Sequence, residues 1–129
     1  MDLAYLGGFF DGEGNVGLYK SGGESPRLRV QVFQNHGASQ DRLMHEIHDT
    51  FGGTLHDRGT GYLYSASGSR AVDLLTQLRP HLRLKLEQAD EALEWWRNRT
   101  AERFRSRTAE EVAYDESAMT RLKELKRAG

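Results

Sequence analysis

Apolar residues near the start of the chain repeat with the spacing of a helix that is buried on two sides. Bulky apolar side chains stand at i, i+3 and i+7, and again at i and i+4: Leu3, Leu6 and Phe10, then Tyr5 and Phe9. Because these stripes lie on different sides, a helix over residues 2–12 needs more than one neighbour to cover it. The pattern therefore predicts a packed N-terminal helix.

Small residues form a third stripe on the same predicted helix. Ala4, Gly8 and Gly12 recur every four residues. Each glycine inside a helix costs roughly 1 kcal/mol relative to alanine. Small residues at this spacing allow a second helix to approach closely, and the contact would offset that cost. We expect the stripe to pack against another helix.

Alternation of apolar and polar residues predicts two β-hairpins. The first joins strands at 15–20 and 27–33 through a loop rich in glycine and serine, and the second joins strands at 54–58 and 62–66. In the strand at 27–33, one face is apolar and the other is polar: Leu28, Val30 and Val32 against Arg27, Arg29 and Gln31. We expect the apolar face in the core and the polar face against an anionic partner.

Helical spacing predicts four further helices. They cover residues 39–51, residues 69 to about 80, a long region from about 84, and the segment from 109. Ser39 is expected as the N-cap of the first, with Leu43, Ile47 and Phe51 as its buried stripe. The predicted order is helix, two strands, helix, two strands, helices.

Length and composition favour one domain over residues 1–129, with a core at about 3–95 and a helical C-terminal extension at about 96–129. The chain has no cysteine, so disulfides and thiolate metal sites are excluded. The apolar runs are too short to span a bilayer, and no basic signal region precedes the first helix. We therefore expect no membrane association and an intracellular location, in the cytoplasm or an organelle matrix.

The charge of the chain is nearly balanced, with a net value of −1. Proteins that bind nucleic acid nonspecifically usually have a basic excess, so general polyanion binding is not favoured. Basic residues do gather in one stretch: Arg97, Arg99, Arg103, Arg105 and Arg107. This stretch would either follow a phosphate backbone or form an exposed helix face.

The segment Leu6-Gly7-Gly8-Phe9-Phe10-Asp11-Gly12-Glu13-Gly14 resembles the LAGLIDADG motif of homing endonucleases. Blocks at 30–34, 56–59, 75–80 and 82–85 are also similar to those of single-motif members, so the resemblance covers roughly residues 3–95. It implies an α+β fold of order αββαββα with a four-stranded antiparallel sheet shaped as a saddle. C-terminal helices would follow this core.

The resemblance implies a catalytic site at the end of the motif helix. Glu13 would bind the catalytic metal together with the carbonyl of Gly12, while Gln34 would lie near the attacking water and Lys85 would polarise that water or stabilise the phosphate. The metal would be Mg²⁺, with Mn²⁺ able to substitute. Glu87 stands where a second basic residue can occur, which would weaken the positive charge around the site.

The resemblance also implies a homodimer bound to double-stranded DNA. The motif helices of two chains would meet at Ala4, Gly7, Gly8, Asp11 and Gly12, with Asp11 accepting backbone N–H bonds between them. The implied DNA-binding residues are Arg27, Arg29, Gln31, Tyr19, His56 and Arg58. The implied function is cleavage of both strands of a long pseudo-palindromic site, in the service of intron or intein mobility.

Other interpretations of the same residues stay open. A protein with this fold that binds nucleic acid without cutting it, such as an RNA-splicing maturase or a DNA-binding regulator, is the alternative function. Without the resemblance, the first segment is a buried helix with Asp11 and Glu13 solvated after it. His45 and His48 lack a third metal ligand at a recognisable spacing, and Trp95 with Trp96 would either stack on bases or close the core.

Overall fold

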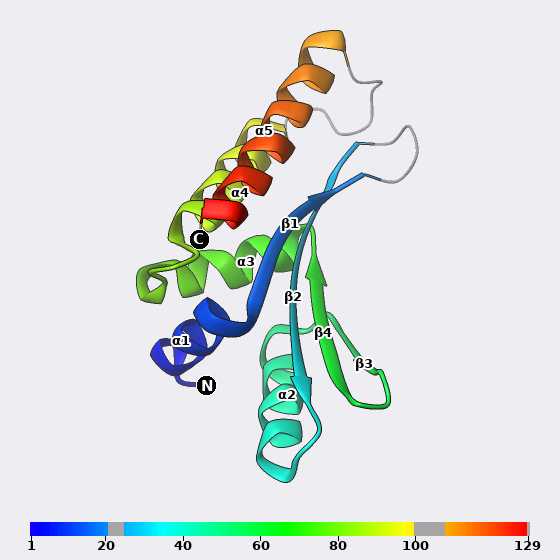
Figure 1. The fold of residues 1–129 in the computed structure, drawn as a ribbon, viewed down its shortest axis with the longest axis vertical. Coiled ribbons are helices and arrows are strands. Elements are labelled where there is room, and N and C mark those ends of the chain that lie inside the picture. Colours follow the sequence, from blue (N-terminus) through cyan, green and yellow to red (C-terminus); the bar gives the residue numbers. More distant parts are fainter. Residues whose placement is uncertain (21–24, 100–107, 129) are drawn as a thin grey trace.

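A four-stranded antiparallel sheet with helices packed on one face is the centre of the molecule (Figure 1). This computed structural model describes residues 1–20, 25–99 and 108–128. The strands are β1 (Gly14–Tyr19), β2 (Arg27–Asn35), β3 (Thr54–Asp57) and β4 (Gly61–Ser67), in the order β1-β2-β4-β3. The helices are α1 (Leu3–Glu13), α2 (Ala38–Phe51), α3 (Ser69–Leu78), the 3₁₀ turn η1 (Arg79–His81), α4 (Leu86–Arg99) and α5 (Ala109–Ala128).

Helix α1 begins at a side-chain cap and runs directly into β1. The Asp2 carboxylate accepts hydrogen bonds from the backbone N–H groups of Ala4 and Tyr5 at 2.9 and 3.1 Å. At the other end, the N–H of Gly14 donates to the carbonyl of Phe10. A Cβ on Gly14 would lie 2.4 Å from the Phe10 ring, so only glycine fits where the helix becomes a strand.

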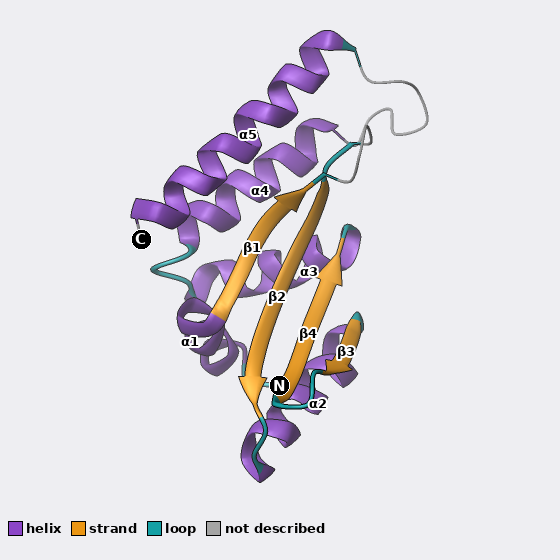
Figure 2. Ribbon diagram, turned by 45° about the vertical axis from the view of Figure 1, so that its right-hand side comes forward, coloured by secondary structure: helices purple, strands orange, loops and turns teal. Residues whose placement is uncertain are grey.

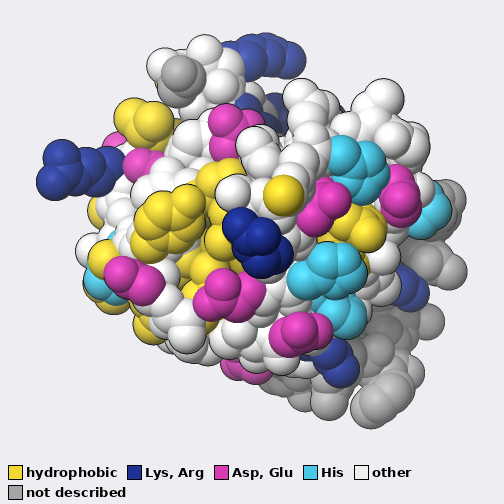
Figure 3. Space-filling view, turned by 90° about the horizontal axis from the view of Figure 1, so that it is seen from below, with side chains coloured by type: hydrophobic (Ala, Val, Ile, Leu, Met, Phe, Trp, Pro, Cys, Tyr) yellow, Lys and Arg dark blue, Asp and Glu magenta, His cyan; other side chains and the backbone are white. Residues whose placement is uncertain are grey.

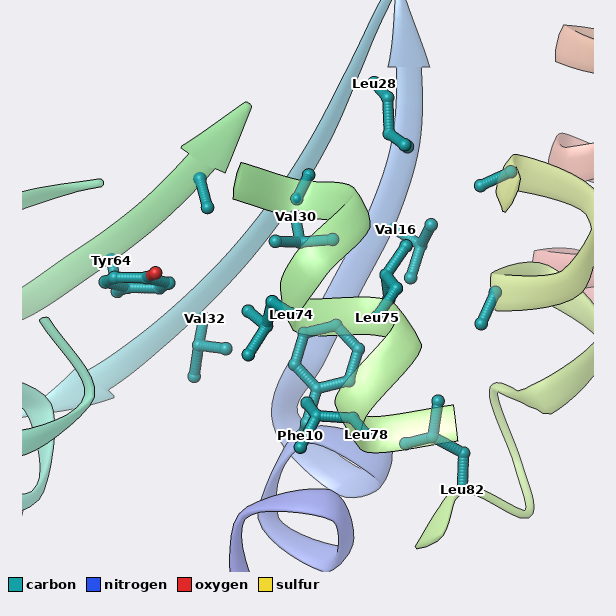
Figure 4. Close-up of a cluster of buried hydrophobic side chains, with 14 of the residues drawn as sticks. Phe10, Val16, Leu28, Val30, Val32, Tyr64, Leu74, Leu75, Leu78 and Leu82 are labelled. Atoms are coloured by element: carbon teal, nitrogen blue, oxygen red, sulfur yellow. The ribbon is translucent and has the colours of Figure 1, made fainter. Parts of the chain in front are cut away.

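The two faces of the sheet differ as the alternation in β2 predicts. The face that meets the helices buries the following side chains: Val16, Leu18, Leu28, Val30, Val32, Tyr64 and Ala66. Phe10 of α1 and Leu74, Leu75 and Leu78 of α3 pack against this layer (Figure 4). No helix of the described residues covers the opposite face, and in the view of Figure 2 helices α2 and α3 lie behind the strands. The predicted α+β fold with a four-stranded antiparallel sheet is confirmed.

Two predicted helix starts are wrong, and each has a structural cause. Helix α2 begins after Gly37, whose carbonyl accepts the N–H of Asp41 at 2.8 Å, so Ser39 lies inside the first turn and is not the N-cap. Helix α4 begins at Leu86 and not near Leu84. The N–H of Leu84 is held by Asp11 of α1, which keeps that part of the chain outside the helix.

Helix α5 packs on α4 and the edge strand β1, so the C-terminal region contributes to the core. Ala118 and Leu122 are buried, and the indole N–H of Trp95 in α4 donates to the Asp115 carboxylate at 2.9 Å. Trp95 is itself inaccessible, which rules out base stacking by this residue. Among the described residues, no helix combines the length and apolar character that crossing a membrane requires.

Replacing Leu122 by alanine tests the docking of α5. The side chain is 2% exposed, so Leu122→Ala should lower the free energy of unfolding by about 2–5 kcal/mol through lost burial and a cavity. Leu84→Ala is the matched control, because that leucine is 72% exposed and its loss should change stability by less than about 0.5 kcal/mol. Urea titration followed by circular dichroism measures both. Equal effects would mean that α5 does not close the core.

Candidate catalytic site and nucleic-acid interface

The Asp11 carboxylate joins the end of α1 to a segment seventy residues later in the chain. Its oxygens accept backbone N–H bonds from Arg83 at 3.1 Å, Leu84 at 2.9 Å and Lys85 at 2.8 Å. Asp11 is 8% exposed, so these bonds replace most of its hydration. Asp11, predicted to link two motif helices, thus links two segments of one chain, and its role between chains stays a prediction.

The surroundings of Asp11 favour its charged form. Burial alone would raise the pKa of the carboxyl group, but the N–H groups of Leu84, Lys85 and Arg83 and the positive charge of Lys85 lower it further than burial raises it. The net result is a pKa below the ordinary aspartate value. The carboxylate is therefore favoured over the neutral acid, and its negative charge holds the segment at 83–85 against α1.

The ammonium group of Lys85 completes this contact. Its Nζ donates to the carbonyl oxygen of Asp11 at 2.5 Å, one of the last carbonyls of α1. Helix C-termini carry partial negative charge, so a cation is favoured there. Lys85 thereby contacts α1 at the carbonyl of Asp11, two residues before Glu13.

The remaining predicted catalytic residues lie at the end of α1 and on β2. Gly12 and Glu13 are exposed, and Glu13 is the last residue of α1. In the register of β1 and β2, Gly14 directly follows Glu13 and pairs with Val32, and Gln34 lies two residues further along β2. Gln34 has the same parity as Val32 and thus faces the helices, half-buried. Glu13 and Lys85 therefore lie at the end of α1, and Gln34 lies two residues beyond the β2 position that pairs with Gly14.

Metal ligands at this end are few. Within residues 1–20, 25–99 and 108–128, no three or more histidine, cysteine or acidic side chains group closely enough to hold a metal ion. His45 and His48 accordingly form no metal site with other described residues. The Glu13 carboxylate and the Gly12 carbonyl are hard oxygen ligands of the kind that Mg²⁺ prefers, and Mg²⁺ also keeps several waters. They fit a metal that is shared with a substrate.

The small-residue stripe of α1 is open on the surface of one chain. Ala4, Gly8 and Gly12 are exposed, and a Cβ placed on Gly8 or Gly12 would meet nothing within 4 Å. Gly7 differs, since its Cβ would lie 2.4 Å from Cβ of His81 in the same chain. Figure 3 shows hydrophobic side chains gathered toward the side where α1 lies. Of the residues predicted at the interface, Gly7 and Asp11 are therefore engaged within the chain, while the stripe is available.

Tyr19 and Arg29 form one unit on the helix-free face of the sheet. The Tyr19 ring folds back over Gly17, where any Cβ would clash with it at 2.4 Å, and its hydroxyl accepts from the Asn15 amide at 2.6 Å. The Arg29 guanidinium lies 4.6 Å from the ring centroid, within cation–π range. Tyr19 thus supports Arg29 in a defined position.

The other predicted DNA-binding residues lie on the same face or at its rim. Arg27 is exposed opposite Tyr19, and the Gln31 amide donates to the Ser65 hydroxyl at 3.2 Å. His56 is exposed on β3, and Arg58 follows in the turn before β4. The structure therefore assembles these six side chains along one open surface.

A cluster of one histidine and two aspartates was not predicted from the sequence. His36 lies between two carboxylates, with Nδ1 at 2.9 Å from Asp41 and Nε2 at 2.9 Å from Asp57. Hydrogen bonds to Asp41 and Asp57 raise the pKa of the His36 imidazole, and His36 in turn lowers the pKa of Asp57. The three residues tie the end of β2 to α2 and the second hairpin. No sequence spacing signals this cluster, because only the strand register brings its members together.

The arginine-rich stretch is described only in part. Arg99 lies with its guanidinium 5.0 Å from the Trp95 ring centroid and 5.5 Å from that of Trp96. Arg103, Arg105 and Arg107 lie outside the described residues. The predicted phosphate-tracking role of this stretch stays a prediction.

The order of helices and strands, with the acidic motif at the end of α1, defines the fold of the LAGLIDADG homing endonucleases. The resemblance predicted from the motif is confirmed at the level of the fold. No protein-family model and no curated protein sequence matches the chain.

Three solved structures illustrate the similarity. The homing endonuclease I-CvuI, in complex with a DNA target and in the presence of magnesium, aligns over 95% of this chain and 80% of its own, with a TM-score of 0.79 and 21% identity. The homing endonuclease I-TnaI aligns over 98% of this chain and 95% of its own, with a TM-score of 0.71 and 16% identity. The meganuclease I-SmaMI, bound to uncleaveable DNA, aligns over 95% of this chain but 45% of its own, with a TM-score of 0.74 and 17% identity.

Asp11→Asn tests the clamp on the segment at 83–85. Loss of the charge that accepts three N–H bonds should lower the free energy of unfolding at neutral pH by about 2 kcal/mol. Because the folded pKa of Asp11 is lowered, its stabilisation is present above the unfolded value of 3.8 and is lost as pH falls through the folded value. The difference between wild type and variant should therefore shrink below about pH 4.

Urea titrations across pH measure this difference, with Asp73→Asn on an exposed site of α3 as the control. The control should match wild type at every pH. A difference between Asp11→Asn and wild type that persists unchanged into strong acid would contradict the ionic clamp.

Proposed function

We propose that the protein is a single-motif homing endonuclease that cuts both strands of a long, pseudo-palindromic double-stranded DNA site with Mg²⁺. The observation that carries the proposal is that Lys85 is held at the carbonyl of Asp11, two residues before Glu13 at the end of α1, in a chain whose open sheet face carries Arg29 supported by Tyr19. DNA complexes of proteins with the same fold support it. A homing role further implies an intracellular location with access to DNA, and intron or intein mobility.

The donors at the end of α1 suit a divalent ion. Glu13 and the Gly12 carbonyl would hold Mg²⁺, and Mn²⁺ would substitute because it takes the same oxygen ligands. When bound, the ion supplies Lewis-acid stabilisation of the phosphate oxygens and a more acidic water. One carboxylate per chain is enough, since phosphate oxygens and water complete the coordination of Mg²⁺.

Lys85 and Gln34 would act around the scissile phosphate. The Lys85 ammonium is already fixed at the carbonyl of Asp11, so its charge is preorganised where negative charge develops in the transition state. The Gln34 amide, at the end of β2, would orient the attacking water through a hydrogen bond. Asp11 acts indirectly, because its three backbone contacts hold Lys85 in place.

Cleavage of two strands calls for two such sites, and a homodimer would provide them. The exposed Ala4, Gly8 and Gly12 stripe gives two copies of α1 a surface for close helix packing. The stripe ends at Gly12, next to Glu13. Pairing of two α1 helices along the stripe would therefore bring the two proposed metal sites close to the symmetry axis of the dimer. The chain spans 45% of I-SmaMI, which leaves room in that longer chain for two units of this size.

Glu13→Gln tests metal-dependent cleavage. The variant keeps the side-chain volume but loses the anionic ligand, so it should bind target DNA and cut it at least about 100-fold more slowly, as expected when a metal ligand is removed. A randomised duplex library incubated with Mg²⁺, followed by sequencing of the cut ends, identifies the target and the wild-type rate.

Glu46→Gln on the exposed side of α2 is the matched control and should cut normally. Chelation of Mg²⁺ should stop cutting by the wild type. Cutting by Glu13→Gln at the normal rate would remove Glu13 from the mechanism, and duplex binding without cutting by the wild type would favour the non-cleaving alternative.

Gly8→Leu tests pairing through α1. A leucine at Gly8 meets nothing in its own chain, yet it would hold two helices apart and weaken the dimer by at least about 1–3 kcal/mol. Light scattering should therefore show a shift from dimer to monomer, with the helical circular dichroism signal retained. Gly7→Ala provides the contrast, because its Cβ clashes with His81 and should lower stability without selectively separating dimers. A wild-type monomer that still cuts both strands would contradict the pairing.

A further inference from the structure

The helix-free face of the sheet has an apolar row among polar ones. Phe33 of β2 pairs with Leu63 of β4, and Leu63 pairs with His56 of β3. Phe33 is 37% exposed and Leu63 is half-buried, and neither belongs to the core or packs against it. Directly paired side chains on one face lie about 5 Å apart. The two apolar side chains therefore form one small patch.

The neighbouring rows on this face are hydrophilic. The next row toward the β1–β2 turn contains Gln31, bonded to Ser65, and the row beyond it contains Arg29 opposite Ser67. The open face thus changes along β2 from cationic, through amide and hydroxyl, to apolar. A partner that fits all three rows must combine negative charge, hydrogen-bonding groups and a small apolar group.

We propose that Phe33 and Leu63 contact the C5-methyl groups of thymine in the target DNA, which makes them determinants of sequence specificity. The inference rests on the proposed function of this face in binding DNA. Among the base edges in the major groove, the thymine methyl is the apolar group, and phenylalanine is one of the side chains that contact it. The phosphates and the other base edges would meet the polar rows.

Strand geometry sets the spacing of the contacts. Side chains on one face recur every two residues, or about 6.7 Å, and base pairs rise about 3.4 Å. Each row therefore corresponds to about two base pairs when the strands follow the groove. The thymine contacted by Phe33 should lie about two base pairs from the position of Gln31 and about four from that of Arg29.

Charge argues against a second copy of the chain as the occupant of the patch. Arg27, Arg29 and Arg58 lie on or beside the same face, so two copies meeting there would bring arginines together. DNA instead presents phosphates that attract the arginines, and its thymine methyl groups can contact the apolar patch. DNA therefore fits the charge and the apolar character of the face together.

Deoxyuridine provides the test, since it differs from thymidine only by the absent methyl. Wild-type protein is first used to select duplexes from a randomised library. Each thymine of the selected duplex is then replaced singly by deoxyuridine, and binding is measured at constant salt. One or two positions per half-site should bind wild type about fourfold more weakly, the effect of losing one buried carbon from an apolar contact.

Variants locate the effect. Phe33→Ser should lose the sensitivity to deoxyuridine at those positions, Phe33→Leu should keep part of it, and Arg29→Ala should keep it fully while relaxing a guanine preference elsewhere. Circular dichroism checks that the variants fold. If Phe33→Ser unfolds, Phe33→Leu takes its place, and an unchanged response of that variant to deoxyuridine would overturn the assignment to Phe33.

The outcomes separate this inference from the proposed function. If no duplex is enriched, DNA binding and the inference both fail. If a duplex is enriched but no deoxyuridine replacement weakens binding, or Phe33→Ser responds to deoxyuridine like wild type, the methyl contact alone is wrong. Conversion of a wild-type dimer into a monomer by Phe33→Ser would assign the row to contact between copies and overturn the inference.

Discussion

The contact between Asp11 and the segment at 83–85 is the constraint on which the rest of the site depends. A buried carboxylate with three N–H donors cannot be moved without exposing charge and unpaired amides, so it fixes the end of α1 against a distant part of the chain. Lys85 then takes its place at the same helix end through its side chain as well as its backbone. The ordinary flexibility of a loop between η1 and α4 is thereby removed where the chemistry is proposed.

The second organising feature is the difference between the two faces of the sheet, one buried against helices and the other open. Leu28, Val30 and Val32 anchor β2 in the core, and the residues between them point toward the open side. The packing that stabilises the sheet also orients those outward residues, because successive side chains of a strand alternate. Tyr19 adds a local support, since its ring is held over Gly17 and beside the Arg29 guanidinium. The outward side chains Tyr19 and Arg29 therefore have defined positions in the chain alone.

Local patterns in the sequence were sufficient for most of the fold. The spacing in α1 and the alternation in β2 identify both elements because burial on one side leaves a periodic trace. The motif likewise predicts the position of Gly12 and Glu13 at the end of α1, where both are exposed. The N-cap predicted at Ser39 is wrong, because serine only favours that position. The carbonyl of Gly37 already accepts the first hydrogen bond of α2, so the helix begins earlier.

Long-range contacts could not be predicted in the same way. The partners of Asp11 are backbone groups, which every residue possesses, and thus have no sequence signature. The link between Trp95 and Asp115, and the cluster around His36, depend on how α5 and the second hairpin dock. The pairing of Gln34 with Tyr62 is known only from the strand register.

The alternation of β2 has a consequence for how such a protein changes over evolutionary time. Substitutions at its outward positions alter what the surface presents while leaving the buried layer intact, so variation there is nearly neutral for folding. Lineages can drift among many surface compositions without passing through unfolded intermediates. The same separation makes these positions suitable for engineered libraries, in which stability and target choice are varied independently.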